Sequence, residues 1–359
     1  MLIDKKNNFL KTFIKRKVLV TGSTGFKGSW LCFWLKELNA NVVGIGLKPE
    51  KNEIIFKALN IKKKIKQYYL DINNFKALNK IIKKEKPSIV FHLAAQSIVS
   101  EGYRFPLNTF QTNLIGSSNL MESCRINKIK NLVYITSDKC YLNEGKKLRY
   151  TEKDVLGGND PYSASKAGAE IIFHSYLKSF FINKKKIKFA SGRAGNVIGG
   201  GDMKTNGIIP DIFKSIKLKK KLFIRNPNFI RPWQHVLEAL SGYLILGHLL
   251  IKNKLPNSYY ASWNFGPRNL KKINVKQLSD EFFSYWGIKK NFKYLKSSKF
   301  KEAKLLILNS SKANKELKWR SRLTFKETIN LTVRWYKDFL EKKDLQKTTL
   351  SQIKYYLKK

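Results

Sequence analysis

The chain has 359 residues, of which 43% are hydrophobic and 13% aromatic, a length and composition that suit one large packed unit or a two-part domain and exclude a disordered chain. Lys and Arg outnumber Asp and Glu by 71 to 25, which gives a formal charge of +46 and raises the question of nucleic acid or an anionic membrane. The lysines are spread along the whole chain, without an arginine-rich arm or a nucleic-acid motif. We therefore expect solvated helix faces and no nucleic-acid partner.

The sequence also argues against a membrane segment, a leader and a metal site. No apolar run approaches the length of a membrane helix, and the longest, 240–251, predicts a buried helix. Residues 1–17 lack the apolar core of a signal peptide, so we expect a cytoplasmic protein with no membrane partner. Cys32, Cys124 and Cys140 are odd in number and far apart, which predicts free thiols and no metal.

Short β-rich runs alternate with helical patterns through the first half of the chain, as they do in βαβ units. The predicted strands cover 17–21, 42–47, 67–72, 88–95, 131–137 and 187–192, and the predicted helices cover 30–38, 106–127 and 161–181. This order predicts an α/β fold with a Rossmann-type doubly wound parallel sheet in residues 1–192.

Beyond residue 192 the pattern breaks into loops that contain Gly and Pro, short helices and isolated strands. We expect residues 193–340 to form mostly a smaller substrate-binding part, with segments around 233–265 returning to the first domain. The charged stretch 341–359 predicts a solvated terminal helix.

Three glycines follow the first predicted strand. Gly22, Gly25 and Gly28 have the spacing G-x-x-G-x-x-G and open a helix. Such glycines let the backbone turn tightly and approach a pyrophosphate, which then lies on the helix N-terminal amides. Any tight turn from a strand to a helix can use glycines, but the position between a strand and a helix favours a dinucleotide site.

The sequence leaves the choice between NAD and NADP open. In NAD-binding sheets of this type, an acidic residue at the end of the second strand binds the ribose hydroxyls. This chain has Leu47, Lys48 and Pro49 at that point. Asp71, after the third predicted strand, has two equally good interpretations: a hydrogen bond to adenine, or the N-cap of the next helix.

Tyr162 and Lys166 lie four residues apart on a predicted helix and therefore share one face. The lysine ammonium can lower the pKa of the phenol and hold a cofactor ribose, while the phenol exchanges a proton with a substrate hydroxyl. The helix begins at Asp160 and Pro161, a plausible N-cap and first helical residue. Ser137 ends the preceding strand, at the edge where ligands of open α/β sheets bind.

With these residues in this order, the chain resembles the extended short-chain dehydrogenase/reductases, the superfamily of nucleotide-sugar epimerases and dehydratases. The stretches VTGSTGFKGSWL, FHLAAQ, TSDKCY, DPYSASKAGAE, RAGNVIGGGD, IRNPNFIRPWQHVLE and WNFGP extend from Val20 to Pro267 and resemble the 4,6-dehydratase branch that acts on CDP-glucose. The resemblance implies bound NAD, with Phe26, Leu93, Ala94 and Ala95 among the residues around it, and a homodimer or a tetramer.

The same resemblance implies an internal redox cycle on the sugar. Tyr162 takes the proton of the C4 hydroxyl as NAD accepts the hydride, water leaves across C5 and C6, and the hydride returns to C6 to give CDP-4-dehydro-6-deoxyglucose. Ser137 holds the C4 oxygen, Asp138 is the acid for the C6 hydroxyl and Lys139 is the base at C5. Related thymidine-diphosphate enzymes carry Glu at the position of Lys139. A capping role for Asp138 and a solvated Lys139 stay open as alternatives.

The resemblance also places four polar residues near the substrate. Arg193, Asn196 and Arg231 match positions close to the nucleotide, Arg225 is a further candidate, and an arginine can bind a phosphate with two parallel hydrogen bonds. Each arginine could instead be an ordinary salt-bridging residue. Two other functions stay open: a different nucleotide-sugar dehydratase or 4-epimerase, and an inactive relative that binds an anionic polymer through its basic faces.

Overall fold

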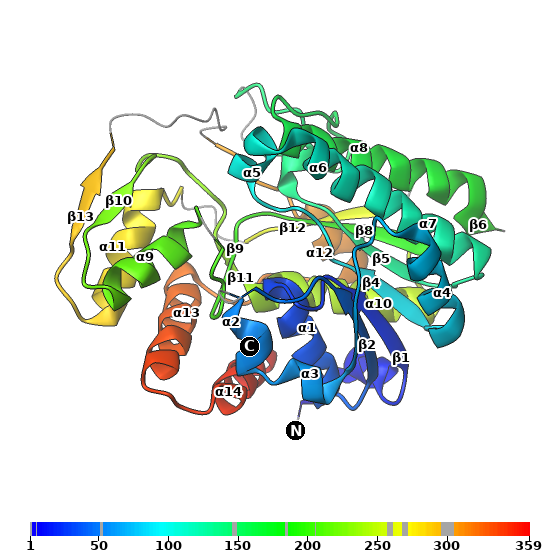
Figure 1. Cartoon of the computed structure of the whole chain (residues 1–359), viewed down its shortest axis with the longest axis horizontal. Coiled ribbons are helices and arrows are strands. Elements are labelled where there is room, and N and C mark those ends of the chain that lie inside the picture. Colours follow the sequence, from blue (N-terminus) through cyan, green and yellow to red (C-terminus); the bar gives the residue numbers. More distant parts are fainter. Residues whose placement is uncertain are drawn as a thin grey trace.

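The β-rich runs assemble into one seven-stranded sheet in which every neighbouring pair is parallel, as Figure 1 shows. This computed structural model describes residues 2–4, 6–50, 53–145, 149–183, 186–204, 206–256, 261–267, 272–295 and 305–359. The strands lie in the order β12 (Ser262–Phe265), β8 (Phe189–Ala194), β5 (Leu132–Ile135), β4 (Ile89–His92), β1 (Lys17–Thr21), β2 (Asn41–Gly46) and β3 (Lys66–Tyr69).

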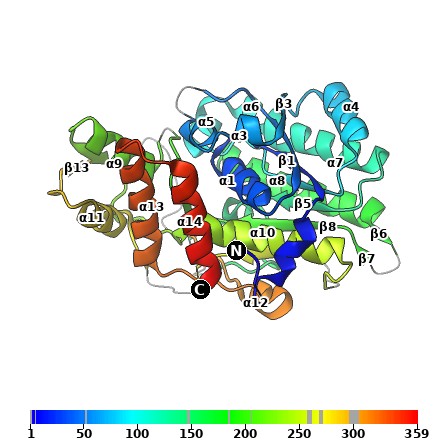
Figure 2. The same cartoon turned by 90° about the horizontal axis from the view of Figure 1, so that it is seen from below.

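Helices cover both faces of this sheet, which explains why six of its strands are buried along nearly their whole length, whereas the edge strand β3 is partly exposed. One face carries α1 (Phe26–Glu37) and α10 (Val236–Ile251), and the other carries α4 (Phe75–Glu85), α7 (Ser117–Ile126) and α8 (Pro161–Tyr176) (Figures 1 and 2). The strand order and the two helix layers confirm the predicted Rossmann-type doubly wound sheet.

Two long predicted helices are composite. The run at 106–127 forms α6 (Pro106–Phe110), a π-helical turn η2 (Gln111–Gly116) and then α7, and the run at 161–181 forms α8 followed by a π-helical turn η4 (Leu177–Phe181). Shorter elements complete this half: η1 (Asn8–Phe13), α2 (Ile54–Ala58), α3 (Ile61–Lys64), α5 (Val99–Arg104), η3 (Asp138–Cys140), β6 (Ile182–Asn183) and β7 (Lys186–Ile187). None of the helices in the described residues is both long and apolar enough to cross a membrane.

Part of the chain beyond β8 forms a second, smaller group of elements, drawn at the left of Figure 1. It contains α9 (Ile208–Lys217), β10 (Leu222–Ile224), α11 (Val275–Trp286), β13 (Phe292–Tyr294) and α13 (Phe325–Leu340), with β10 and β13 paired in parallel. The short strands β9 (Val197–Ile198) and β11 (Gln234–His235) pair with each other between the two groups, and α12 (Ser311–Leu317) packs beside β12. Strand β12 itself lies in the central sheet, next to β8.

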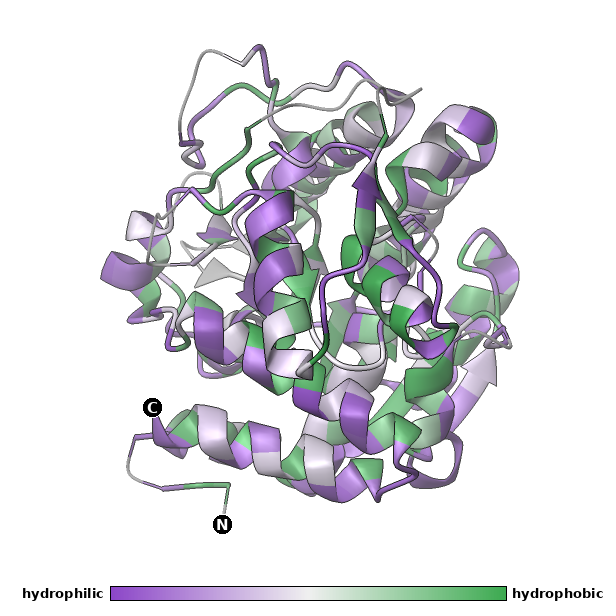
Figure 3. Cartoon of the chain, turned by 90° about the vertical axis from the view of Figure 1, so that its left-hand side faces the viewer, coloured by the Kyte–Doolittle hydropathy of each residue, from purple (hydrophilic) through white to green (hydrophobic). Residues whose placement is uncertain are grey.

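The C-terminal stretch differs from the sequence expectation. Residues 345–358 do form a helix, α14 (Leu345–Lys358), but it is packed rather than solvated: Ile353, Tyr356 and Leu357 are buried. Figure 3 shows hydrophobic and hydrophilic residues alternating along it. The side-chain amide of Asn7 donates a hydrogen bond to the carbonyl oxygen of Leu357 at 3.0 Å, so the two ends of the chain lie together. The sparse apolar residues fall on one face, which packs against α13 and α1.

Candidate active site

The turn between β1 and α1 is built so tightly that two of its glycines have no room for a side chain. Gly22 has a φ of +70°, and a Cβ there would lie 2.8 Å from the backbone nitrogen of Ala94. A Cβ on Gly28 would lie 1.9 Å from the carbonyl oxygen of Gly22. The turn is thus pressed against the chain that leaves β4, where Leu93 and Ala94 follow the strand. These positions need glycine because backbone atoms surround them.

The N-terminus of α1 has the features of an anion site. Its N-cap is Gly25, which provides no side-chain cap for the first amides of the helix. The next two residues, Phe26 and Lys27, line a cavity. Burial and the neighbouring Lys204 lower the pKa of Lys27 to about 8.

A cavity of about 370 Å³ lies at the carboxyl ends of the sheet strands, between the sheet and the smaller group of elements. The structure brings many of the predicted site residues into its wall: Ser137, Asp138, Lys139, Tyr162, Asn196, Arg225 and Arg231, with Phe26 at one side. They come from the end of β5, from α8, and from the segments around β9 and β10. Residues far apart in the sequence therefore face one space.

The segment after β5 carries three of these side chains. The Ser137 hydroxyl donates a hydrogen bond to Oδ1 of Asp138 at 2.9 Å and accepts one from the backbone nitrogen of Lys139 at 3.3 Å. Asp138 is 2% exposed, and its Oδ2 has no hydrogen-bond partner among the described residues. A Cβ on Gly195 would lie 2.0 Å from that oxygen, so the glycine leaves room for the carboxyl group. Lys139 is half-buried.

Tyr162 and Lys166 lie on the first turns of α8, whose N-cap Asp160 accepts a hydrogen bond from the backbone nitrogen of Ser163 at 2.9 Å. Both are buried, and the ammonium of Lys166 lies 5.9 Å from the centre of the Tyr162 ring. Burial raises the pKa of Tyr162, and a hydrogen bond with Ser137 opposes that rise. Burial, then Lys27, lowers the pKa of Lys166 to about 7. The phenol pKa is therefore raised in the protein alone, opposite to the sequence expectation, because desolvation outweighs the hydrogen bond with Ser137.

Three of the four predicted substrate residues line the cavity. Arg225 donates a hydrogen bond to the carbonyl oxygen of Asn206 at 3.2 Å, and Arg231 donates one to the carbonyl oxygen of Ile230 at 3.0 Å. Asn196 has a φ of +40°, and its side-chain oxygen has no partner among the described residues. Two cationic groups and one amide therefore border the space in which a diphosphate would lie.

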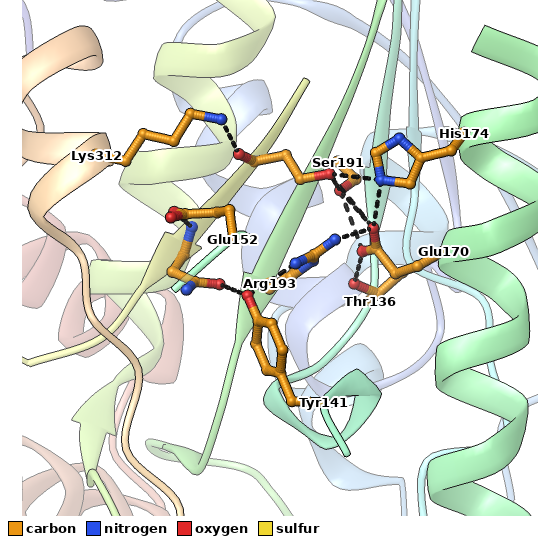
Figure 4. A network of polar contacts seen from close by, with 10 residues as sticks. Thr136, Tyr141, Glu152, Glu170, His174, Ser191, Arg193 and Lys312 are labelled. Atoms are coloured by element: carbon orange, nitrogen blue, oxygen red, sulfur yellow. Dashed lines mark hydrogen bonds and ion pairs between the residues drawn. The ribbon is translucent and has the colours of Figure 1, made fainter. Parts of the chain in front are cut away.

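Arg193 is placed differently from the sequence expectation. It is 0% exposed, and its guanidinium donates to the Glu170 carboxylate at 2.7 Å and to the Tyr141 hydroxyl at 2.8 Å, as Figure 4 shows. It does not line the cavity. The side chain turns from β8 toward α8 and the chain after β5, and these contacts occupy both terminal nitrogens of the guanidinium that was expected to bind a phosphate.

A second cavity, of about 490 Å³, adjoins the first through shared residues that include Phe26 and Lys204. Ala95, Leu47, Glu50 and Glu53 are among the residues in its wall. Asp71 lines neither cavity: it is exposed, and its Oδ1 accepts a hydrogen bond from the backbone nitrogen of Asn73 at 2.9 Å. The N-cap of α4 is Asn74, three residues after Asp71, so the interpretation of Asp71 as the N-cap is wrong.

Sequence reasoning missed several residues of the cleft. Lys27 could have been noticed, because it stands between two of the three glycines in the first turn of a helix. Phe223 and Phe229 also line the first cavity, and Phe223 is 56% exposed although aromatic. Nothing in the local pattern around the two phenylalanines distinguishes a cavity wall from a core.

Comparisons with known proteins identify the family of the chain. The family model described as GDP-mannose 4,6 dehydratase matches residues 19–332. The CDP-glucose 4,6-dehydratase of Salmonella typhimurium is 38% identical, covering 95% of this chain and 96% of that protein. The dTDP-D-glucose 4,6-dehydratase of Dictyostelium discoideum is 28% identical, covering 92% and 84%.

Solved structures share the fold. A UDP-glucose 4-epimerase of Thermotoga maritima, solved with UDP-glucose, is 23% identical with a TM-score of 0.78 and covers 90% of this chain and 99% of that one. A dTDP-glucose 4,6-dehydratase of Bacillus anthracis, solved with NAD, is 23% identical with a TM-score of 0.76 and covers 92% and 99%.

Proposed function

This chain belongs to the GDP-mannose 4,6-dehydratase family, and from this we propose its reaction. It removes water from CDP-glucose and forms CDP-4-dehydro-6-deoxyglucose with the help of NAD. The observation that carries the proposal is the meeting of Ser137, Asp138, Lys139 and Tyr162 in one cavity beside the glycine-rich turn. A 4,6-dehydration needs an acid and a base in addition to the groups that handle the C4 hydroxyl. This cavity contains candidates for all of them.

The residues around the turn suit NAD. The uncapped N-terminus of α1 and the ammonium of Lys27 would hold the pyrophosphate. Lys166 lines neither cavity but lies beside Tyr162, which lines the first, and would hold the nicotinamide ribose. The carboxylates of Glu50 and Glu53 line the second cavity near the end of β2 and would repel the 2′-phosphate of NADP. When bound, NAD would supply the hydride acceptor for C4 of the sugar and the hydride donor for C6.

Four polar residues of the first cavity then have a defined task. Tyr162 removes the proton of the C4 hydroxyl, and Ser137, which hydrogen-bonds to it, holds the C4 oxygen. The C5 proton becomes acidic once C4 is a ketone; Lys139 removes it and returns it to C5 when the hydride arrives at C6. Asp138 delivers a proton to the departing C6 hydroxyl through its unpartnered Oδ2. For this task Asp138 has to be protonated and Lys139 neutral at the moment of elimination.

Arg225, Arg231 and Asn196 are proposed to bind the nucleotide diphosphate, because all three border the cavity on the side of the smaller group of elements. The cytidine base is proposed from overall similarity: the CDP-glucose enzyme is 38% identical, against 28% for the dTDP-glucose enzyme. Lys139 supports the same choice, since a lysine at this position agrees with the CDP-glucose branch.

The test is product formation from separate sugar nucleotides. Purified protein with NAD is incubated with CDP-, dTDP-, UDP- and GDP-linked sugars, and the alkali-induced absorbance of a 4-keto-6-deoxy product is followed. A signal with CDP-glucose alone is expected. A signal with another nucleotide would correct the base, and no signal with any of them would overturn the dehydratase proposal.

A 4-epimerase is the competing function, because UDP-glucose 4-epimerases share the fold. Epimerisation needs neither an acid for C6 nor a base for C5, so Asp138→Asn and Lys139→Ala separate the two reactions. In a dehydratase both variants lose product formation, whereas in an epimerase neither loses turnover. The unpartnered buried oxygen of Asp138 favours the dehydratase, because a carboxyl group without a task is costly to bury.

We also propose a homodimer. The helices α6 to α8 expose large apolar side chains at Leu107 (83% exposed) and Ile171 (58%), with Ile115 on η2 and Phe180 on η4 close in sequence. Such side chains mark an association surface. Light scattering should give a dimer mass for the natural chain and a monomer mass for the double variant Leu107→Glu, Ile171→Glu; a natural chain of monomer mass would contradict the proposal.

A cytoplasmic location and a role in making deoxysugars for surface polysaccharide are part of the same proposal. The three cysteines are free and buried, which suits a reducing compartment. A labelled fusion protein that fractionates with cytoplasmic markers would support the location, and recovery in the periplasm or the medium would oppose it.

A further inference from the structure

The catalytic groups of the proposed function come from two separate parts of the chain. Ser137, Asp138 and Lys139 follow β5, whereas Tyr162 and Lys166 lie on α8. Acid, base and phenol must act on neighbouring atoms of one sugar, and a displacement of about 1 Å in any of them would already slow the reaction. Something must therefore fix the segment after β5 relative to α8.

A buried ion pair stands between these two parts. Glu170 follows Lys166 by one helical turn on α8, and Arg193 comes from β8. Their carboxylate and guanidinium lie 2.7 Å apart, and both residues are 0% exposed. Burial by itself would raise the pKa of Glu170, but Arg193 lowers it to about 2. The pair is thus charged, and its geometry is strongly constrained because neither charge can turn to solvent.

Each member of the pair holds one end of the catalytic segment, as Figure 4 shows. On the near side, the hydroxyl of Thr136, the residue before Ser137, donates a hydrogen bond to Oε1 of Glu170. On the far side, Arg193 donates to the hydroxyl of Tyr141 at 2.8 Å. The residues Ser137 to Cys140 lie between these two anchors.

The far anchor is itself held by the sheet. The Tyr141 hydroxyl donates a hydrogen bond to Oδ1 of Asn264 at 2.7 Å, and Asn264 on β12 is the register partner of Arg193 on β8. The guanidinium carbon of Arg193 lies 5.0 Å from the centre of the Tyr141 ring. The tyrosine thus contacts the guanidinium with both its hydroxyl and its ring, and Asn264 fixes its direction.

We propose that Glu170, Arg193 and Tyr141 form a clamp of positioning residues that fixes Asp138 and Lys139 relative to Tyr162. The proposal rests on the function proposed above. All three are at most 2% exposed and none lines the first cavity, so the clamp acts on Asp138 and Lys139 through the chain and not by contact with the sugar. Loosening the clamp lowers the rate of turnover and leaves the substrate affinity nearly unchanged, because the residues that border the diphosphate lie elsewhere.

The test variant is Tyr141→Phe, which removes both hydrogen bonds of the hydroxyl and keeps the ring. Glu170→Gln and Arg193→Lys are less suitable first choices, because each leaves a buried charge poorly paired and the chain could fail to fold. Thr136→Val loosens the near anchor with a side chain of the same shape. The matched control is Tyr356→Phe: Tyr356 is also fully buried and donates to a buried carboxylate, Oε2 of Glu238, at 2.9 Å, but it lies on α14 and lines neither cavity.

We expect Tyr141→Phe to lower kcat by about tenfold to a hundredfold, the cost of a misplaced catalytic group, with KM for the sugar nucleotide changed by less than about twofold. Both variants lose a comparable buried hydrogen bond, so Tyr356→Phe and Tyr141→Phe should lower the melting temperature by similar amounts. Tyr356→Phe should leave kcat at the natural value. An unchanged kcat in Tyr141→Phe, or an equal loss in Tyr356→Phe, would overturn the clamp.

Hydrogen exchange makes the test independent of the proposed reaction. In the NAD-loaded protein, the amides of residues 137–141 should exchange faster in Tyr141→Phe and at the natural rate in Tyr356→Phe. If the natural chain makes no product from any sugar nucleotide, the proposed function fails, and exchange still decides whether the clamp exists. Unchanged exchange at 137–141 would refute the clamp whatever the activity.

Discussion

Gly28→Ala is the substitution whose outcome the structure predicts most directly. Its added Cβ would lie 1.9 Å from the carbonyl oxygen of Gly22 and 2.7 Å from the carbonyl carbon, whereas ordinary contact begins at 3.4 Å. The first turn of α1 and the glycine-rich turn must therefore separate by about 1.5 Å (3.4 − 1.9). Both partners are backbone, so no side-chain rotation can relieve the contact.

The size of the effect follows from two opposing terms. Overpacking of a buried position costs up to about 3 kcal/mol, and alanine recovers about 1 kcal/mol of helix propensity relative to glycine. We expect a net loss of about 2 kcal/mol in the free energy of unfolding. A displacement of more than 1 Å at the turn should also weaken NAD binding by about tenfold or more.

Gly25→Ala is the matched control. A Cβ on Gly25 has its nearest neighbour at 3.5 Å, and the residue has an ordinary φ of −78°. The free energy of unfolding should therefore change by less than about 1 kcal/mol, because Gly25 makes no side-chain cap bond that alanine would remove. The added methyl group would still obstruct the approach of the pyrophosphate to the backbone, so NAD affinity should fall.

Urea unfolding followed by tryptophan fluorescence measures the first quantity, and calorimetric titration with NAD measures the second. The packing argument predicts that Gly28→Ala loses both stability and affinity, and that Gly25→Ala loses affinity alone. If Gly28→Ala unfolds at the same urea concentration as the natural chain, or if Gly25→Ala is the less stable of the two, the reasoning is refuted.

Three further outcomes follow from the same structure. The folded pKa of Lys166, about 7, lies below its ordinary 10.5, so between these values the unfolded state binds more protons and the NAD-free fold gains stability as pH rises. Lys166→Met should therefore stabilise the NAD-free fold at pH 7, and this gain, measured by urea unfolding, should shrink toward pH 10. A gain that is the same at both pH values would contradict the lowered pKa. Removal of residues 345–358 uncovers the apolar contacts of α14 and should cost several kcal/mol, so an unchanged melting temperature would mean that the helix is solvated after all. Glu50→Gln with Glu53→Gln should reduce the preference for NAD over NADP by about tenfold in binding titrations, and an unchanged ratio would exclude these carboxylates as the cause.

The sequence predicted the parts of this protein that depend on local rules. Strands buried on both faces are recognisable as short apolar runs, and their alternation with helices permits few topologies, so the doubly wound sheet could be predicted. The glycine spacing could also be interpreted locally. Gly22 and Gly28 must be glycines because backbone atoms of the same turn and of the adjoining strand end leave no room for a Cβ. Tyr162 and Lys166 share a face of α8 because four residues make about one helical turn.

Tertiary structure decided the direction of side chains whose partners lie far along the chain. Arg193 stands near the end of a strand, where a ligand contact was expected, but a buried carboxylate on α8 captures it because a guanidinium inside the protein needs an opposite charge. The helix α14 looked solvated because its apolar residues are few, yet they meet a surface that only the folded chain provides. Local sequence fixes which groups are present and on which element they stand, whereas the groups they meet depend on long-range packing, which no local pattern records.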